Sequence, residues 1–258
     1  MIKNYFDLTG QTAVVTGAST GLGVQMAKAL ANQGCNIVAM ARRQNLIDDV
    51  AAEIAKEYGV KAVGIRCDIT DTESVDSAVD AALAEFGRID ILINNAGTGG
   101  VTPAEDMPDS TFENEMNIDL FGTFKVSRAV AKKAMLPAKY GRIINIASMY
   151  GLVGNKIAPT ACYHAAKGGV VNLTRALAAE WGEKGINVNC ICHGYFYTPL
   201  TEETLNSEFF RNYAKTMIPL SRYGNEGELD TAAIFLASPA SSYVNGQNIA
   251  VDGGYTCM

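Results

Sequence analysis

Two residues four positions apart, Tyr163 and Lys167, are the chemically most informative feature of the chain. On a helix this spacing places both side chains on one face, so the phenol and the ammonium can reach one pocket. A free tyrosine, with a pKa near about 10, is a poor proton shuttle at neutral pH. Because a neighbouring cation favours the phenolate, the pair suits proton transfer to or from a substrate oxygen.

A glycine turn at residues 16–23 (Thr-Gly-Ala-Ser-Thr-Gly-Leu-Gly) follows an apolar strand-like run and opens a helix-like segment. Free backbone amides and the positive end of the helix then face the same point, which suits a phosphate. Gly17 permits the tight turn, while Gly21 and Gly23 permit close approach of a pyrophosphate and of the neighbouring strand. A phosphate cradle together with an activated tyrosine predicts hydride transfer to or from an alcohol carbon.

Length, charge and hydropathy fit one enzyme domain. The chain has 258 residues, enough to bury a full core. Its net charge of −6 gives no reason to expect nucleic acid or an anionic membrane surface as a partner. No apolar run approaches the roughly 20 residues that span a bilayer, and residues 1–7 lack the apolar core of a secretion signal. We expect a cytoplasmic protein that acts on a small molecule.

The cysteines are expected to be buried thiols. Cys35, Cys67, Cys190 and Cys192 lie in or beside apolar strand-like runs, where a reduced cysteine behaves as a small hydrophobe. A metal site at Cys190, Cys192 and His193 is the alternative. One-residue spacing on a strand is wrong for a zinc knuckle and no second ligand pair follows, so we expect no metal.

Short apolar runs alternate with segments of helical period along the whole chain. Most of the runs are bounded by glycine or polar residues, which suits strands buried on both faces. The predicted strands are 12–16, 36–41, 61–66, 89–94, 142–147, 186–191 and 248–251, and the predicted helices are 22–33, 46–58, 72–86, 110–135, 161–181 and 226–236. This alternation predicts an α/β fold with one doubly wound, Rossmann-type parallel sheet of about seven strands in a single domain.

With these motifs in this order, the chain resembles the short-chain dehydrogenase/reductase family over essentially its whole length. The glycine turn matches the family's Thr-Gly-x-x-x-Gly-x-Gly pattern, residues 94–97 its Asn-Asn-Ala-Gly motif, Tyr163 and Lys167 its Tyr-x-x-x-Lys pair, and Ser148 its active serine. The resemblance implies that the tyrosine transfers the proton, the serine orients the substrate oxygen and the lysine holds the nicotinamide ribose. It also implies that family members are commonly homotetramers, and that the cofactor is contacted by Gly17, Ser19, Thr20, Gly21, Leu22, Gly23, Arg42, Arg43, Asp68, Ile69, Asn95, Ala96, Gly97, Tyr163, Lys167, Gly194, Phe196 and Thr198.

Three positions depart from the family pattern. Asp119 stands where the family usually has a catalytic asparagine that supports a relay water; an aspartate there can hold a water and would raise the pKa of Lys167, or it can simply bond within its helix. The interval from Ser148 to Tyr163 is two residues longer than the family norm, so we expect a loop around residues 154–159 on the substrate side. His193 replaces a proline, and a local hydrogen bond is its expected role.

The cofactor prediction rests on the end of the second strand. NAD-specific members usually carry an acid there to bind the ribose hydroxyls. Here Ala41 stands in its place and Arg42 and Arg43 follow, which suits a phosphate dianion and favours NADP(H) over NAD(H). The alternative is that both arginines are a solvated helix start.

The substrate prediction rests on two stretches, residues 145–149 and 243–254, which are most similar to gluconate 5-dehydrogenases and deoxygluconate dehydrogenases. They imply a sugar acid or polyol. The aromatic segment 195–217 resembles the family's substrate lid, although a helix packing face explains its aromatics equally well. The alternatives are a 3-oxoacyl carrier-protein reductase, a hydroxysteroid dehydrogenase, and a nucleotide-binding sensor or scaffold without catalysis.

Overall fold

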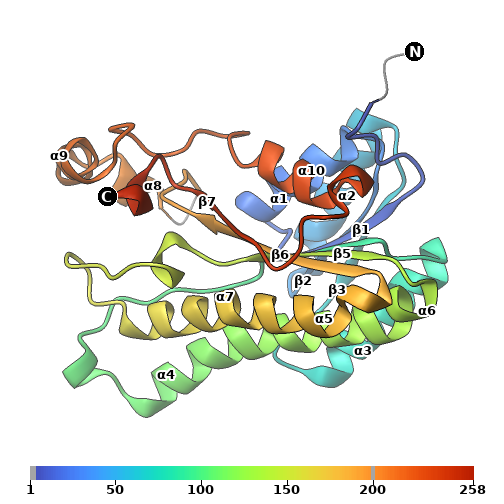
Figure 1. Cartoon of the computed structure of the whole chain (residues 1–258), viewed down its shortest axis with the longest axis horizontal. Coiled ribbons are helices and arrows are strands. Elements are labelled where there is room, and N and C mark those ends of the chain that lie inside the picture. Colours follow the sequence, from blue (N-terminus) through green and yellow to red (C-terminus); the bar gives the residue numbers. More distant parts are fainter. Residues whose placement is uncertain (1–3, 199–200) are drawn as a thin grey trace.

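The computed structural model describes residues 4–198 and 201–258 and has three layers, with a sheet between two layers of helices (Figure 1). Within the described residues the sheet has seven strands, all parallel, in the order β3-β2-β1-β4-β5-β6-β7. The strands are β1 (Thr12–Thr16), β2 (Asn36–Ala41), β3 (Ala62–Arg66), β4 (Ile91–Asn94), β5 (Gly141–Ile146), β6 (Ile186–His193) and β7 (Asn248–Val251). Strand order reverses between β1 and β4, which is where such sheets bind ligands.

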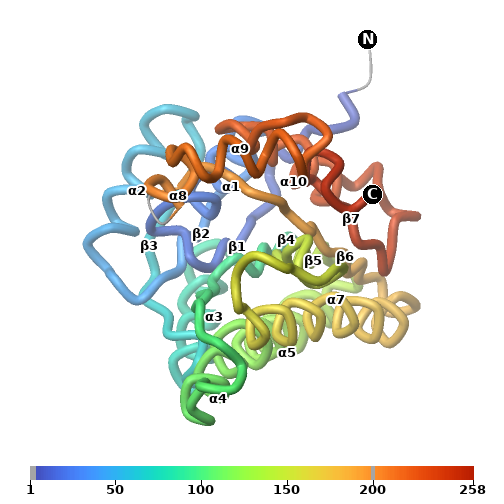
Figure 2. Tube along the Cα trace, turned by 90° about the vertical axis from the view of Figure 1, so that its left-hand side faces the viewer, coloured from blue at the N-terminus to red at the C-terminus, as the bar shows by residue number. Residues whose placement is uncertain are grey.

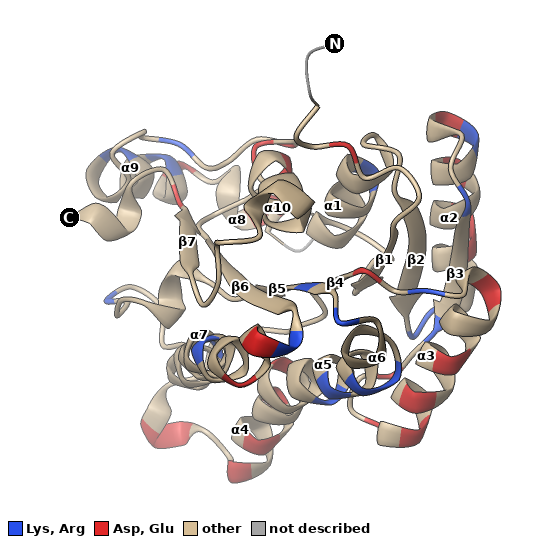
Figure 3. Ribbon diagram, turned by 45° about the vertical axis from the view of Figure 1, so that its right-hand side comes forward, with Lys and Arg blue, Asp and Glu red and all other residues tan. Residues whose placement is uncertain are grey.

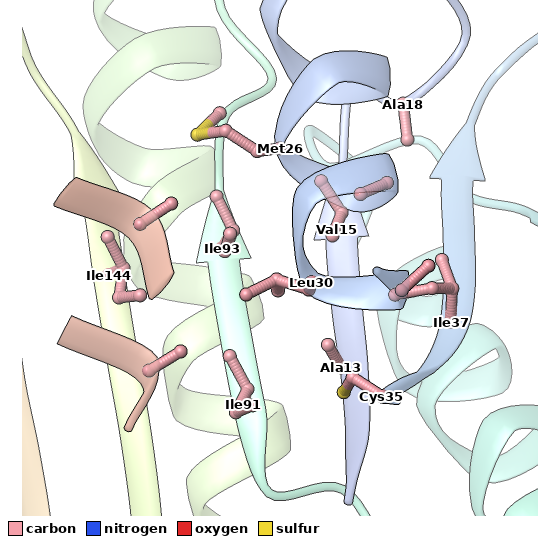
Figure 4. Close-up of a cluster of buried hydrophobic side chains, with 14 of the residues drawn as sticks. Ala13, Val15, Ala18, Met26, Leu30, Cys35, Ile37, Ile91, Ile93 and Ile144 are labelled. Carbon is pink, nitrogen blue, oxygen red and sulfur yellow. The ribbon is translucent and has the colours of Figure 1, made fainter. Parts of the chain in front are cut away.

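Two apolar clusters hold the helices against the two faces of the sheet. Successive strand residues point to opposite faces, so Ala13 and Val15 join one cluster and Val14 the other. Figure 4 shows Leu30 and Met26 over the first face. That face is covered by α1 (Leu22–Ala31), α2 (Gln44–Tyr58) and α10 (Asp230–Ala237), and the opposite face by α3 (Thr72–Phe86), α5 (Thr123–Val130) and α7 (Ala161–Trp181).

The helix predicted over residues 110–135 is one rod from 109 to 138 with two wider turns in it. It comprises α4 (Asp109–Met116), a π-helical turn (Asn117–Gly122), α5, a second π-helical turn (Ala131–Met135) and α6 (Leu136–Ala138). Wide turns of this kind often occur at functional sites. Here the first one carries Asp119, whose side chain is fully buried.

The other predicted boundaries agree with the structure to within two residues, except at the start of α10. That helix was predicted from Glu226 but begins at Asp230. The reason is Gly227, whose φ of 86° is left-handed and ends any helix that passes through it. Strand β6 continues past Ile191 because Cys192 and His193 pair with Ala250 and Val251 of β7.

In the segment predicted as a lid, 195–217, residues 199 and 200 lie outside the described residues, and the described part contains two short helices. They are α8 (Glu202–Leu205) and α9 (Glu208–Met217), and the Ser207 hydroxyl caps α9 by accepting the Phe210 amide at 3.0 Å. Figure 2 looks at the molecule from the side where α4 and α7 begin, with α8 and α9 across the sheet from them. Among the described helices, none is both long and apolar enough to cross a membrane.

Candidate active site

A cavity of about 700 Å³ opens at the carboxyl ends of the strands. Its lining comes from the loops that follow β1 to β6, so segments far apart in sequence meet there. Of the predicted site residues, the lining contains Gly17, Ser19, Thr20, Gly21, Leu22, Arg42, Arg43, Asp68, Ile69, Asn95, Ala96, Gly97, Ser148, Tyr163, Lys167, Gly194, Phe196 and Thr198. Gly23 and Asp119 lie behind this lining and are buried.

The glycine turn ends at the start of α1 and leaves that helix end free for an anion. Gly21 has a left-handed φ of 63°, and neither a side-chain cap nor an acidic residue occupies the first turn. Backbone amides near Leu22 therefore have no competing carboxylate. Gly23 permits the predicted close approach of the neighbouring strand: a Cβ there would meet the Gly17 carbonyl oxygen at 2.5 Å and the side chain of Asn95, which follows β4, at 2.6 Å.

Asn95 fixes the glycine turn against the end of β4. Its side-chain amide donates to the carbonyls of Thr16, at 3.1 Å, and Gly17, at 3.3 Å. In return the Thr16 hydroxyl accepts the amides of Asn95, at 3.0 Å, and Ala96, at 3.1 Å. These four bonds tie the loops after β1 and β4 together, so this part of the phosphate cradle is shaped before any ligand binds.

The end of the cavity next to β2 carries basic side chains. Ala41 ends β2 without a carboxylate, and the Arg43 guanidinium donates to the Ser19 hydroxyl at 3.1 Å. Asp68 is the one acidic side chain among the described lining residues. Hydrogen bonds from Thr70 lower the pKa of Asp68, with smaller contributions from Arg42 and Arg66. A dinucleotide with an additional ribose phosphate fits this charge arrangement.

Ser148, Tyr163 and Lys167 meet in the middle of the cavity. Ser148 follows β5, and its hydroxyl accepts the Tyr150 amide at 3.1 Å. Tyr163 lies in the first turn of α7 and Lys167 one turn later, with its ammonium 5.5 Å from the centre of the Tyr163 ring. The Lys167 ammonium also donates to the Ile146 carbonyl at 3.2 Å. The predicted shared face of Tyr163 and Lys167 is therefore present.

Asp119 contacts this group directly. Its Oδ1 lies 3.2 Å from the Lys167 Nζ and accepts the Thr98 amide at 3.0 Å. Burial lowers the pKa of Lys167, but the opposite charges of Tyr163 and Asp119 outweigh it, so the net shift is upward, as predicted. For Asp119, burial raises the pKa, although the charge of Lys167 acts to lower it. Since a Cβ at Gly97 would collide with Oδ1, that glycine makes the arrangement possible.

A buried amide network holds the strands beneath the site. The Asn94 side chain of β4 donates to Ser127 at 2.8 Å and to Asn145 of β5 at 2.9 Å. Asn145 in turn donates to the Thr174 hydroxyl of α7 at 2.9 Å. The two central strands and the helix that carries Tyr163 are thus linked by polar bonds that water cannot reach, which makes the site rigid.

The end of the cavity beyond Ser148 includes residues that the sequence did not identify, namely Thr98, Gly99, Met149 and Tyr150. The Tyr150 hydroxyl is bonded to that of Tyr195, and the Tyr150 ring stacks on His164 with ring centres 4.7 Å apart. The position of Tyr150, two residues after Ser148 at the end of a strand, is the signal that could have indicated it.

The aromatic residues of segment 195–217 divide into two groups. Tyr195 and Phe196 line the cavity, whereas Phe210 and Tyr213 are buried in an apolar cluster with Tyr255. Tyr195 also packs against this cluster, with its ring centre 4.9 Å from that of Phe210. The Tyr213 and Tyr255 hydroxyls are bonded at 2.8 Å. The packing interpretation therefore holds for α9.

His193 makes the local bond that was predicted: its Nδ1 donates to the Gly194 carbonyl at 2.8 Å. It is the last residue of β6 and also lines the cavity. Burial lowers its pKa to about 4, so the ring is neutral at neutral pH. Nearby, Cys190 and Cys192 are buried free thiols with their sulfurs 3.9 Å apart, and Cys35 and Cys67 are also buried and unpaired, as predicted.

This fold and this site define a class of protein, and comparison with known proteins gives the same class. Residues 17–256 match the family model described as Enoyl-(Acyl carrier protein) reductase. The chain belongs to the short-chain dehydrogenase/reductase family, and it is an oxidoreductase that acts on an alcohol or a ketone with a nicotinamide cofactor.

Individual relatives cover almost the whole chain. It is 40% identical to the gluconate 5-dehydrogenase of Gluconobacter oxydans, over 97% of this chain and 96% of that one. It is 39% identical to the D-threitol dehydrogenase of Mycolicibacterium smegmatis, over 97% of this chain and 95% of that one. A solved structure of a Burkholderia cenocepacia gluconate 5-dehydrogenase in complex with NADP and tartrate superposes with a TM-score of 0.94 at 36% identity, over 98% of each chain.

Proposed function

We propose that the protein interconverts a secondary alcohol and a ketone of a polyol or sugar acid, with NADP(H) as its preferred cofactor. The observation that carries this proposal is the Lys167 ammonium 5.5 Å from the Tyr163 ring, in one cavity with Ser148 and the glycine turn. Relatives named for gluconate, threitol and galactitol support the substrate class.

In the proposed reaction Tyr163 moves the proton. A nicotinamide bound in the cavity would supply the acceptor for the hydride of the alcohol carbon. The Tyr163 phenolate takes the hydroxyl proton as the carbonyl forms, and the Ser148 hydroxyl donates a hydrogen bond to the same oxygen. Lys167 stabilises the phenolate and holds the nicotinamide ribose. In this proposal Asp119, whose Oδ1 lies 3.2 Å from the Lys167 ammonium, passes the proton onward.

The preference for NADP(H) rests on the end of β2. Arg42 and Arg43 line the cavity, and Ala41 supplies no carboxylate to compete for ribose hydroxyls. Two solved gluconate 5-dehydrogenases with similar structures, from Burkholderia cenocepacia and Beutenbergia cavernae, have NADP bound. NAD(H) would bind the same cradle without the phosphate contact.

We also propose a cytoplasmic homotetramer in which segment 195–217 acts as the substrate lid. Ala165, Ala176 and Ala179 are exposed on α7, and small side chains of this kind would suit a close helix pairing between copies. Light scattering at micromolar concentration should give four times the chain mass of 27.5 kDa, and a monomer would exclude this assembly.

A substrate panel tests the proposed activity. Polyols, aldonates and keto-sugars are incubated with NADP(H) and with NAD(H), and the absorbance of the reduced nicotinamide is followed. An acetoacetyl thioester is included because a 3-oxoacyl carrier-protein reductase of Synechocystis is 39% identical, and a hydroxysteroid because it is the further enzyme alternative. Turnover of a polyol or sugar acid supports the proposal. Preferential turnover of the thioester or steroid contradicts it, and no turnover at all favours a nucleotide-binding sensor or scaffold.

A further inference from the structure

The basic side chains of the cavity lie away from the place where a substrate must bind. Among the described lining residues, the basic ones are Arg42, Arg43 and Lys167. The two arginines follow β2, which is three strands away from β5 and Ser148, a distance of about 14 Å in the plane of the sheet. Lys167 is already paired with Asp119. The substrate end therefore offers no uncompensated positive charge.

The segments around the substrate end are acidic. Residues 97–116 contain five acidic residues and no lysine or arginine, and α4 carries several of these acids (Figure 3). Residues 193–206 contain two acidic residues and no lysine or arginine. Arg211 and Lys215, later in the predicted lid, are exposed and lie outside the described cavity lining. The loop that begins at Gly97 is bonded to the loop before α7, with the Thr102 amide donating to the Pro159 carbonyl at 2.9 Å. The one basic residue of that second loop, Lys156, is exposed and lies outside the described cavity lining. A carboxylate ligand would meet a negative potential here.

Glu115 adds a further carboxyl group behind the site, and burial, with a smaller contribution from Asp119, raises its pKa. Its side chain is only 4% exposed, and its Oε1 has no hydrogen-bond partner among the described residues. It is one turn before Asp119 on the same rod of helix. Together Glu115 and Asp119 place two carboxyl groups behind the site against the single ammonium of Lys167.

The wall that remains is polar but neutral. The hydroxyls of Tyr150 and Tyr195 are bonded to each other, and burial raises the pKa of both groups. The Thr98 and Ser148 hydroxyls and the neutral ring of His193 also line the cavity. Such groups bind hydroxyls by hydrogen bonds but do not compensate a buried carboxylate.

We propose that the substrate is an uncharged polyol or hydroxyketone rather than a sugar acid. Its hydroxyls face Thr98, Tyr150 and Tyr195, and it carries no ionised group at that end. This inference rests on the proposed function and narrows its substrate class.

Matched pairs of substrates test the inference on the unmodified protein. Glucitol is compared with gluconate, and threitol with threonate, in kcat/KM with NADP⁺. We expect the neutral member of each pair to be favoured by at least about tenfold. The difference should shrink as salt is raised from 0.01 M to 0.5 M, because the repulsion is screened. Equal or better turnover of the acids would overturn the inference while leaving the proposed function intact. Turnover of no member of either pair would overturn both.

A charge introduced at the substrate end gives an independent test. Thr98 is exposed in the cavity, and the bond that it makes to Asp119 comes from its backbone amide. T98K should raise the ratio of acid to polyol kcat/KM by about tenfold relative to T98M, a neutral control of similar length. Because the readout is a ratio, a general loss of activity in both variants does not affect it. The same ratio in both variants would contradict the inference.

Discussion

The Lys167 ammonium lies 3.2 Å from the Asp119 carboxylate, and both side chains are buried. Removing one partner of a buried ion pair leaves the other charge uncompensated. A neutral replacement that can hydrogen-bond keeps a polar partner for that remaining charge. The free energy of folding therefore depends on the charges of Asp119, in the turn before α5, and Lys167, in α7. The consequences can be measured separately on each partner.

We expect D119N to keep or raise activity. The asparagine oxygen can still accept the Thr98 amide and the Lys167 ammonium, and asparagine is the residue that the resemblance places there. As a contrast, D119L should lower the free energy of unfolding by about 3–5 kcal/mol, since it leaves the buried Lys167 with neither a counter-charge nor a hydrogen-bond acceptor at this position. A severe loss of kcat in D119N, with an unchanged circular dichroism spectrum, would show that the carboxylate charge itself is needed.

K167M should weaken cofactor binding and lower the rate. It should also move the pH–rate profile to higher pH, because the Tyr163 phenolate loses its neighbouring cation. The double variant K167M/D119N separates stability from chemistry, since it removes both charges of the pair. It should recover the thermal stability lost in K167M but none of the activity. An unchanged pH–rate profile in K167M would leave Lys167 with a structural role alone.

The arginines after β2 should set cofactor preference. Charge-assisted bonds to an exposed phosphate contribute on the order of 1 kcal/mol or more each, so NADPH should be favoured over NADH by at least about tenfold, and less at high salt. R42A should reduce kcat/KM for NADPH far more than for NADH, and A41D should reverse the order. R128A, at an exposed position on α5 outside the described cavity lining, is the matched control. A native preference for NADH would identify both arginines as a solvated helix start.

Asp230 should make stability depend on pH. Burial, with a smaller contribution from Glu226, raises its pKa to about 6 from an ordinary 3.8. The folded chain therefore binds this proton more tightly than the unfolded chain, and the stability that it contributes below about pH 4 is lost as pH rises through 6. D230N should raise the free energy of unfolding at pH 8 and change it much less at pH 4. Urea denaturation at the two pH values measures this, and an equal change at both would refute the assignment.

The sequence was sufficient for the sheet and for the residues at its carboxyl ends, because buried parallel strands are continuous apolar runs and their loops carry the polar motifs. Glycine and tyrosine motifs with fixed local geometry, such as Gly21 and the Tyr163–Lys167 pair, were predictable for the same reason. Contacts between segments that are distant in the sequence could not be predicted. The bond between Tyr150 and Tyr195 and the closeness of Glu115 to the site both depend on how separate segments meet in space.

The π-helical turn at Asn117–Gly122 also could not be predicted, since its residues fit an ordinary helical period. Its formation decides whether Asp119 bonds within its helix or reaches Lys167. Periodicity alone left those two interpretations open. Tertiary packing, with Gly97 leaving room for the carboxylate, determines the outcome.

The most direct test of the proposed reaction is the turnover of Y163F. The variant removes the hydroxyl that transfers the proton and keeps the ring that Lys167 lies against. We expect kcat to fall by roughly 10²–10⁴-fold. The dissociation constant for NADPH, measured by fluorescence titration, should stay within about threefold of the native value, because Y163F keeps the aromatic ring. A threefold change corresponds to less than about 1 kcal/mol of binding free energy. Near-native turnover by Y163F would contradict the assignment of Tyr163 as the proton-transferring group.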